Sequence, residues 1–256
     1  MPTPWARLRG YVERNAAHPM FRRPLEIHTQ QSLISFTFDD FPRSALLAGG
    51  AILKNYGAAG TYYVALSLLG KHNEPSGSTC VSEDLPALLE QGHELGSHTF
   101  SHCHSWDTKA AFFEDSIIKN REALSRFVPG ANFKSFSYPI SEPRPMTKWR
   151  AGKHFLACRA GGQTLNVGTA DLNQLAAFFL EKSRDKIQTI KDLIDKNRDA
   201  RGWLIFATHD VAPNPSPYGC TPEFFEDVVR YAVDSNALVL PVVKALQVIR
   251  DAGSSV

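Results

Sequence analysis

Short apolar runs alternate with longer amphipathic segments along this chain, from residue 32 almost to the C-terminus. The runs are rich in β-branched and aromatic residues, a composition typical of buried strands. The pattern predicts strands at 33–38, 61–65, 94–97, 133–138, 154–158, 203–208 and 237–241. Strands that alternate with helices favour a parallel sheet covered by those helices, so we expect an α/β protein.

The segments between the strands predict helices that begin at capping residues such as Ser, Asp and Thr. They are expected over 82–91, over 107–127, from 169 or 171 to about 197, and from 221 to about 234. In the third of these helices the apolar run Phe178-Phe179-Leu180 is expected to lie in the core, and the charged remainder to face solvent.

The first 31 residues differ from the rest of the chain. They are polar and basic and contain four prolines. We therefore divide the chain into an N-terminal extension, residues 1–31, packed on a main domain, residues 32–256. No internal repeat or low-complexity tract interrupts the main domain.

Charge and cysteine content narrow the class of protein. The chain has 28 basic and 26 acidic residues, a net charge of +2, which gives no electrostatic case for binding nucleic acid or an anionic membrane. Its four cysteines form no CxxC pair, so we expect them to be reduced thiols, as is usual in the cytosol. The N-terminus lacks the apolar core of a secretory signal, and no run has the length of a membrane span. We therefore expect a cytoplasmic protein.

Two adjacent aspartates, Asp39 and Asp40, follow the predicted strand 33–38. Burying paired acids is costly unless a cation compensates them. Neighbouring residues of an extended chain point in opposite directions, so both carboxylates cannot bind one ion in simple strand geometry. One is therefore expected to be a metal ligand, while the other stands off the metal.

Three histidines complete the candidate chemistry. His98 and His102 are four residues apart, which would place both imidazoles on one face of a helical turn. One acid and two histidines, with water in the other positions, are the composition of a catalytic metal site. His209 follows the predicted strand 203–208 and is suited to donate a proton near neutral pH. In parallel barrels such residues gather at the carboxyl ends of the strands.

Four motifs together resemble the polysaccharide deacetylase superfamily, also called the NodB-homology family or carbohydrate esterase family 4. They are TFDD (37–40), SHTFSH (97–102), FSYPI (136–140) and FATHD (206–210). The resemblance extends over about residues 32–245. It implies an α/β fold, a distorted (β/α)7 barrel of mainly parallel strands.

The resemblance also implies roles for the matching residues. Asp39 would be the general base that activates water, and His209 the general acid. Asp40, His98 and His102 would hold a divalent metal, zinc first, with cobalt, nickel, manganese or iron as alternatives.

The third motif departs from the family pattern. Its usual arginine, which contacts the catalytic aspartate, is replaced by Ser137, and Ile140 occupies a position that is often aromatic. Ile140 can still supply the backbone N–H implied for oxyanion stabilisation. We predict that Arg159, at the end of the strand 154–158, replaces the missing cation, with Arg144 as the alternative.

The predicted function is removal of N-acetyl groups from a sugar or polysaccharide precursor by a metal-dependent hydrolase, in surface-polysaccharide biosynthesis. An O-deacetylase or a non-sugar amidase with the same metal site is a second interpretation. A glycan-binding protein of low activity is a third, and a non-haem iron oxygenase, which also uses two histidines and a carboxylate, is a fourth. The expected partner is an acetylated glycan, and the oligomeric state stays open.

Overall fold

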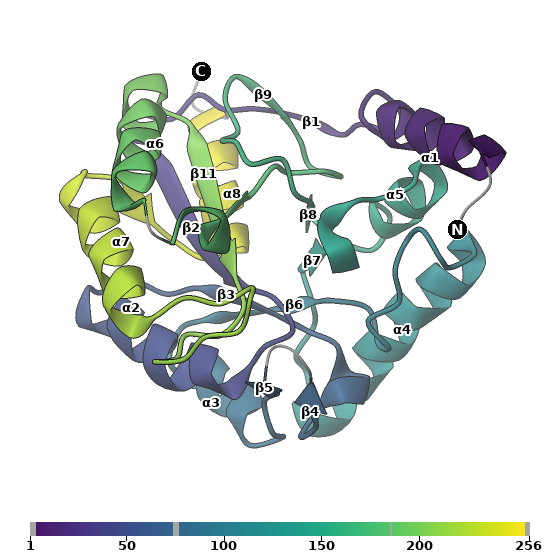
Figure 1. Cartoon of the computed structure of the whole chain (residues 1–256), viewed down its shortest axis with the longest axis horizontal. Helices are drawn as coiled ribbons and strands as arrows, with labels where there is room; N and C mark the ends of the chain where they lie inside the picture. The colour runs from purple at the N-terminus through teal and green to yellow at the C-terminus, as the bar shows by residue number, and fades with distance from the viewer. Residues whose placement is uncertain (1–3, 74–76, 185, 254–256) are drawn as a thin grey trace.

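A parallel sheet forms the centre of the molecule. The computed structural model describes residues 4–73, 77–184 and 186–253 (Figure 1). In the sheet the strands follow the order β10-β11-β2-β3-β6-β7-β8, and β12 pairs with β2 beside β3; every pair is parallel. This sheet with its helices confirms the predicted distorted barrel.

All seven predicted strands are present in this sheet. Their bounds are β2 (Leu33–Phe38), β3 (Thr61–Val64), β6 (Glu94–Ser97), β7 (Ser135–Ser137), β8 (Ala157–Arg159), β11 (Trp203–Thr208) and β12 (Leu238–Val239). The strand β10 (Phe178–Phe179) was not predicted. Two antiparallel pairs lie outside the sheet: β1 (Pro24–Glu26) with β9 (Thr169–Asp171), and β4 (His72–Asn73) with β5 (Gly77–Ser78).

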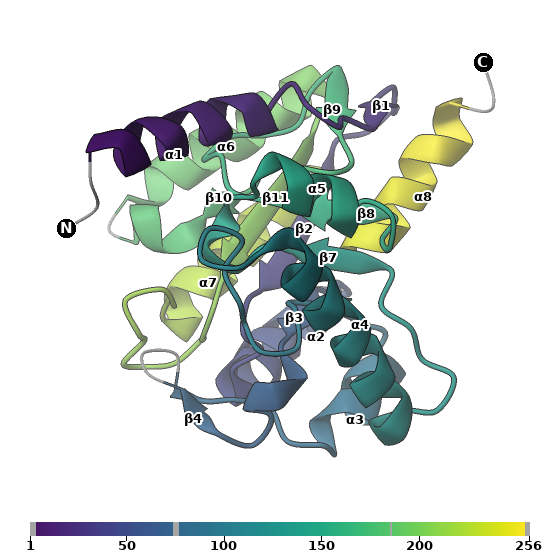
Figure 2. The ribbon, with the colours of Figure 1, turned by 90° about the vertical axis from the view of Figure 1, so that its right-hand side faces the viewer.

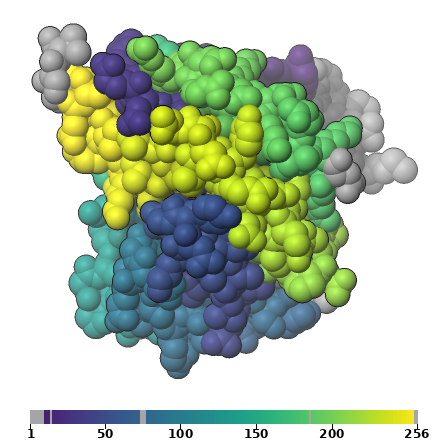
Figure 3. Space-filling view, turned by 90° about the vertical axis from the view of Figure 1, so that its left-hand side faces the viewer, coloured from purple at the N-terminus to yellow at the C-terminus, as the bar shows by residue number. Residues whose placement is uncertain are grey.

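Helices surround the sheet, as Figure 1 and Figure 2 show. They are α1 (Pro4–Ala17), α2 (Ala51–Asn55), α3 (Asp84–Glu90), α4 (Ala110–Phe127), α5 (Pro145–Ala151), α6 (Ile187–Ala200), α7 (Pro222–Asp234) and α8 (Val242–Gly253). The helix predicted from residue 221 is confirmed, because the Thr221 side chain accepts a hydrogen bond from the backbone N–H of Phe224 at the start of α7. α7 also packs on α2, and the yellow C-terminal residues meet the blue residues near position 50 in Figure 3.

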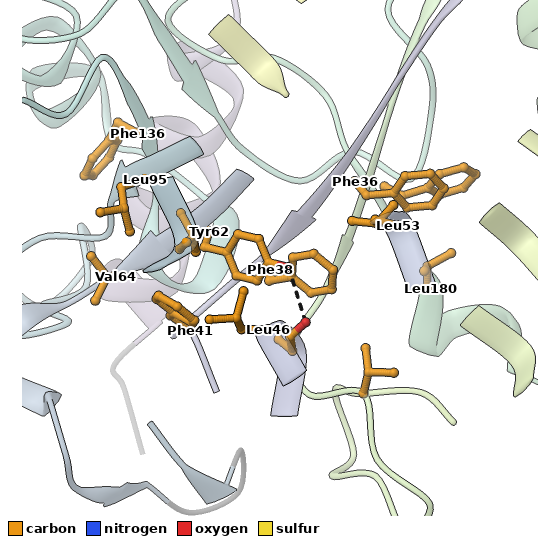
Figure 4. Packing of buried hydrophobic residues seen from close by; sticks show 14 of the residues in the cluster. Phe36, Phe38, Phe41, Leu46, Leu53, Tyr62, Val64, Leu95, Phe136 and Leu180 are labelled. Carbon is orange, nitrogen blue, oxygen red and sulfur yellow. Dashed lines mark hydrogen bonds between the residues drawn. The ribbon is translucent and has the colours of Figure 1, made fainter. Parts of the chain in front are cut away.

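The core lies on both faces of the sheet, which is why β2 is buried at all six positions. Aromatic rings fill one face (Figure 4): Phe38 stacks on Tyr62 with ring centroids 4.5 Å apart, and Phe36 stacks on Phe206 at 5.4 Å. This packing fixes the end of β2, from which the two aspartates emerge.

The long helix predicted from residue 169 or 171 to 197 is wrong in its first half. That segment forms β9, β10 and the short turn η4 (Leu180–Ser183), and α6 begins only at Ile187. Its backbone pairs with distant segments: the Leu172 carbonyl accepts from the N–H of Cys158, and the N–H of Asn173 is bound by the Asp171 carboxylate. Tertiary pairing and this local side-chain bond override the helical pattern.

The N-terminal segment is tied to the barrel by polar contacts. β1 pairs with β9, and α1 lies across α5 (Figure 2). The buried Lys148 ammonium donates to the Ala17 carbonyl at 2.6 Å, and Arg144 pairs with Glu13 at 2.7 Å. The division of the chain at residue 31 stays a prediction.

The four cysteines Cys80, Cys103, Cys158 and Cys220 are all free thiols. Among the helices that the structure describes, none has the length and apolarity needed to cross a bilayer.

Candidate metal centre and active site

The carboxyl ends of the parallel strands open into one cleft of about 760 Å³. Asp39 follows β2, His98 follows β6, and His209 follows β11. Parallel strands bring their carboxyl ends to the same edge, so residues far apart in sequence meet there. The cleft is lined by six of the seven predicted site residues: Asp39, Asp40, His98, His102, Ile140 and His209.

Asp40, His98 and His102 form a cluster with the composition of a metal site. Their potential ligand atoms all lie within 4.8 Å of one another. Asp40 Oδ1 is 3.2 Å from Nε2 of His102 and 3.7 Å from Nε2 of His98. Nδ1 of His98 lies 2.8 Å from the Ser137 carbonyl, a contact that orients the ring and turns Nε2 toward the cluster.

The electrostatics of this cluster fit a cation. Burial lowers the pKa of His98 to about 3 and that of His102 to about 4, so both imidazoles are neutral at pH 7 and keep lone pairs for a metal. Burial raises the pKa of Asp40 to about 6. A divalent ion would favour the ionised carboxylate and reverse that shift. Two neutral imidazoles and a carboxylate are therefore a suitable donor set.

The two histidines do not lie on a helical turn, which corrects the sequence interpretation. Residues 98–103 form a loop, in which Thr99 (φ 60°) and His102 (φ 52°) have left-handed backbones. The chain also turns at Asp40 (φ 59°). Such conformations are rare in residues other than glycine and cost about 1 kcal/mol or more each. These turns bring the imidazoles of His98 and His102 together, as the helical spacing was expected to do.

Asp39 stands beside the metal cluster and has different partners. Its Oδ1 accepts a hydrogen bond from the Ser137 hydroxyl at 3.1 Å. The Arg159 guanidinium donates to the same carboxylate oxygen and to the Ser137 hydroxyl. Arg159 is 1% exposed, and its guanidinium carbon lies over the rings of Tyr63 and Phe179, at 5.3 and 5.6 Å from their centroids. A buried cation therefore fixes the orientation of Asp39.

This cation also sets the charge of Asp39. Burial by itself would raise the pKa of the Asp39 carboxyl, but the charge of Arg159 lowers it to about 2. Asp39 is therefore ionised at neutral pH. Arg144, the alternative source of the cation, pairs with Glu13 instead.

His209 and Ile140 face the same cleft. The backbone N–H of His209 donates to the Tyr218 carbonyl at 3.2 Å. The Asp210 carboxylate accepts from the backbone N–H of Ser216 at 2.8 Å, so the loop after β11 is held by its own hydrogen bonds. Within the described residues, Nδ1 of His209 is buried and has no hydrogen-bond partner. Ile140, half exposed, has a left-handed backbone (φ 55°) that turns the chain at the rim.

The structure adds residues to the cleft that sequence reasoning missed: His18, Gln174, Phe179, Glu181, Lys182 and Tyr218. Burial raises the pKa of Glu181 to about 7. Recognition of β10 would have placed Phe179 and Glu181 at a strand end, but two residues are too short a run to detect. No pattern in the sequence signals His18, which reaches the cleft from the N-terminal segment.

Comparison with solved structures supports the fold. An acetyl xylan esterase of family 4 from Clostridium thermocellum, in complex with a cobalt ion, is 21% identical with a TM-score of 0.58, covering 83% of this chain and 89% of that one. The peptidoglycan deacetylase PdaC from Bacillus subtilis is 14% identical with a TM-score of 0.58, covering 90% and 96%. At such low identity these likenesses establish the architecture alone.

The sequence comparison identifies the family. No curated protein matches this chain. A family model described as polysaccharide deacetylase matches residues 26–157, just over half of the chain, including the segments that supply the two aspartates and the histidine pair. The chain therefore belongs to the polysaccharide deacetylase family.

Proposed function

We propose that this chain is a metal-dependent hydrolase that removes N-acetyl groups from a sugar or a polysaccharide precursor. The observation that carries the proposal is the position of the ionised Asp39 beside the Asp40-His98-His102 cluster, in a cleft that also holds His209. A cytoplasmic location and a role in surface-polysaccharide biosynthesis are part of the proposal and stay predictions.

Asp40, His98 and His102 would hold the metal. When bound there, a divalent ion supplies a Lewis acid that polarises a carbonyl and lowers the pKa of water. Zinc is our first assignment, and cobalt, nickel, manganese and iron suit the same ligands.

The remaining residues divide the proton transfers between them. Asp39, held ionised and oriented by Arg159, accepts the proton of the attacking water. His209 protonates the departing amine, which could not leave as an anion. The backbone N–H of Ile140 is assigned to the oxyanion of the tetrahedral intermediate. We include Arg159 in the catalytic set through its contact with Asp39.

The rival functions differ in the bond that is cleaved. The similar structures include both an acetyl xylan esterase and a peptidoglycan deacetylase, so the fold is compatible with O-acetyl and N-acetyl substrates. A glycan-binding protein would have no use for an ionised carboxylate held by a buried arginine. An iron oxygenase would leave Asp39 without a role.

An acetate-release panel separates these possibilities. We expect the protein, supplied with a divalent metal, to release acetate from a tetramer of N-acetylglucosamine and to release less from acetylated xylan. Release from the xylan alone would replace the amidase assignment by an esterase. Binding of the tetramer without release of acetate from either substrate would favour the glycan-binding interpretation.

Replacing Arg159 tests the cation beside Asp39. Arg159→Ala is expected to lower kcat more than tenfold, roughly 1.4 kcal/mol of barrier, with unchanged metal content. Burial raises the pKa of Asp39, and Arg159 is the group that opposes this most, so without the guanidinium the pKa of Asp39 rises from about 2. Because the base must be ionised, the acidic limb of the pH–rate profile should move to higher pH. Arg144→Ala is the control, since Arg144 pairs with Glu13; an unshifted acidic limb in Arg159→Ala would contradict the assignment.

A further inference from the structure

A second hollow, of about 370 Å³, adjoins the catalytic cleft where the N-terminal segment of the chain borders it. It is lined by His18, Pro19, Arg22, Asp171 and Gln174. His18 and Gln174 also line the main cleft, so the two spaces share a wall. A substrate longer than one sugar, with its acetyl group at Asp39, can therefore extend past these two residues into the hollow.

The wall of the hollow is held in place by a buried cation. The Lys148 ammonium is fully buried and contacts the Ala17 carbonyl at 2.6 Å, the His18 carbonyl at 3.3 Å and the Asp171 carboxylate at 2.7 Å. Nε2 of Gln174 lies 3.4 Å from Nδ1 of His18. The end of α1 and the segment after β9 thus form one supported surface, although they are more than 150 residues apart in sequence.

The charges around this hollow do not balance. The Asp171 carboxylate is already occupied by the Lys148 ammonium and by the backbone N–H of Arg23 at 3.0 Å. Arg22 is exposed, and within residues 4–73, 77–184 and 186–253 no ion pair or side-chain hydrogen bond engages its guanidinium. The hollow therefore presents one uncompensated positive charge, with the five donors of an arginine fork.

We propose that this hollow is a second substrate subsite that binds an anionic group, a carboxylate or a phosphate, carried by the glycan next to the acetylated sugar. An arginine fork matches the two oxygens of a carboxylate or a phosphate. His18 and Gln174 add polar groups suited to sugar hydroxyls. The inference rests on the proposed function, because it assumes that the main cleft takes the acetylated sugar.

All five residues that line the subsite lie outside the segment that the family model matches. The family model begins at residue 26, whereas His18, Pro19 and Arg22 precede it. The subsite is therefore built from residues other than the ligand and base residues, and a change in it leaves Asp39, Asp40, His98 and His102 in place. A uronic acid would supply the carboxylate, and a nucleotide- or lipid-linked sugar would supply the phosphate.

Kinetics with charged and neutral substrates test the subsite. The substrates are UDP-N-acetylglucosamine, a tetrasaccharide of alternating glucuronate and N-acetylglucosamine, and the neutral N-acetylglucosamine tetramer. Arg22→Gln should raise KM at least about tenfold for one of the two anionic substrates, with kcat unchanged and KM for the neutral tetramer within about twofold, because it removes one charge-assisted contact. The substrate that responds identifies the phosphate or the carboxylate.

Arg126→Gln is the control, because Arg126 is an exposed arginine on α4 that lines neither hollow. Equal effects on neutral and anionic substrates, or no effect, would overturn the proposal.

Binding without turnover separates this inference from the proposed function. UDP-glucose and a glucuronate-containing disaccharide carry no acetyl group, and their affinity can be measured by calorimetry. Arg22-dependent binding of either one, with no acetate release from any substrate, would keep the subsite and reject the deacetylase. Acetate release with no tighter binding of these probes than of neutral cellobiose would keep the deacetylase and reject the subsite.

Discussion

Asp39→Asn is expected to lower acetate release by about 10²- to 10⁴-fold, the range attributed to a general base. Asparagine keeps the size of the side chain and can still accept a hydrogen bond from Ser137, but it cannot take a proton from water. Asp39 contacts Ser137 and Arg159 and lies outside the ligand cluster, so the metal content should be unchanged.

Turnover and metal content must be measured on the same preparations. Ser137→Ala is a matched control, because it removes a hydrogen bond to Asp39 and leaves the carboxylate in place. Its loss of activity should be much smaller than that of Asp39→Asn. Loss of metal from Asp39→Asn, with part of the activity retained, would mean that Asp39 and Asp40 have exchanged roles.

Asp40→Ala, His98→Ala and His102→Ala are each expected to lose metal and activity together. Two imidazoles and one carboxylate are the whole donor set found in the described residues, so no spare ligand can compensate. Removing an outer partner of a metal ligand already costs about 10- to 100-fold in affinity, and loss of a ligand should cost more.

His104→Ala is the control for these variants. Its ring lies 5.5 Å from that of His102, but it is not part of the cluster. It should therefore retain the metal of the wild-type protein. Full metal occupancy in His102→Ala would contradict the ligand assignment.

Strand ends were the most predictable feature of this protein. β2 and β11 are continuous apolar runs of six residues, and each is followed directly by polar side chains, Asp39 in one case and His209 in the other. Parallel topology then required these ends to meet. The contact of Arg159 with Asp39 could be predicted by the same argument from parallel strand ends, since Arg159 ends β8.

Other parts of the site could not be predicted from a local sequence pattern. The spacing of His98 and His102 fits a helix, whereas a loop with left-handed residues brings them together. Phe179 and Glu181 belong to a segment whose helical pattern is overridden by pairing with neighbouring strands. His18 enters the cleft because Lys148 and Asp171, distant in sequence, hold the end of α1. These positions depend on tertiary contacts, which leave no periodic pattern in the sequence.

The most direct test of the central claim is the metal content of protein purified without a metal-affinity step, measured together with acetate release before and after chelation. We predict one divalent ion per chain, loss of acetate release when the ion is removed, and recovery when zinc or another suitable divalent metal is returned. Undiminished acetate release from metal-free protein would contradict the assignment of Asp40, His98 and His102 as a catalytic metal centre.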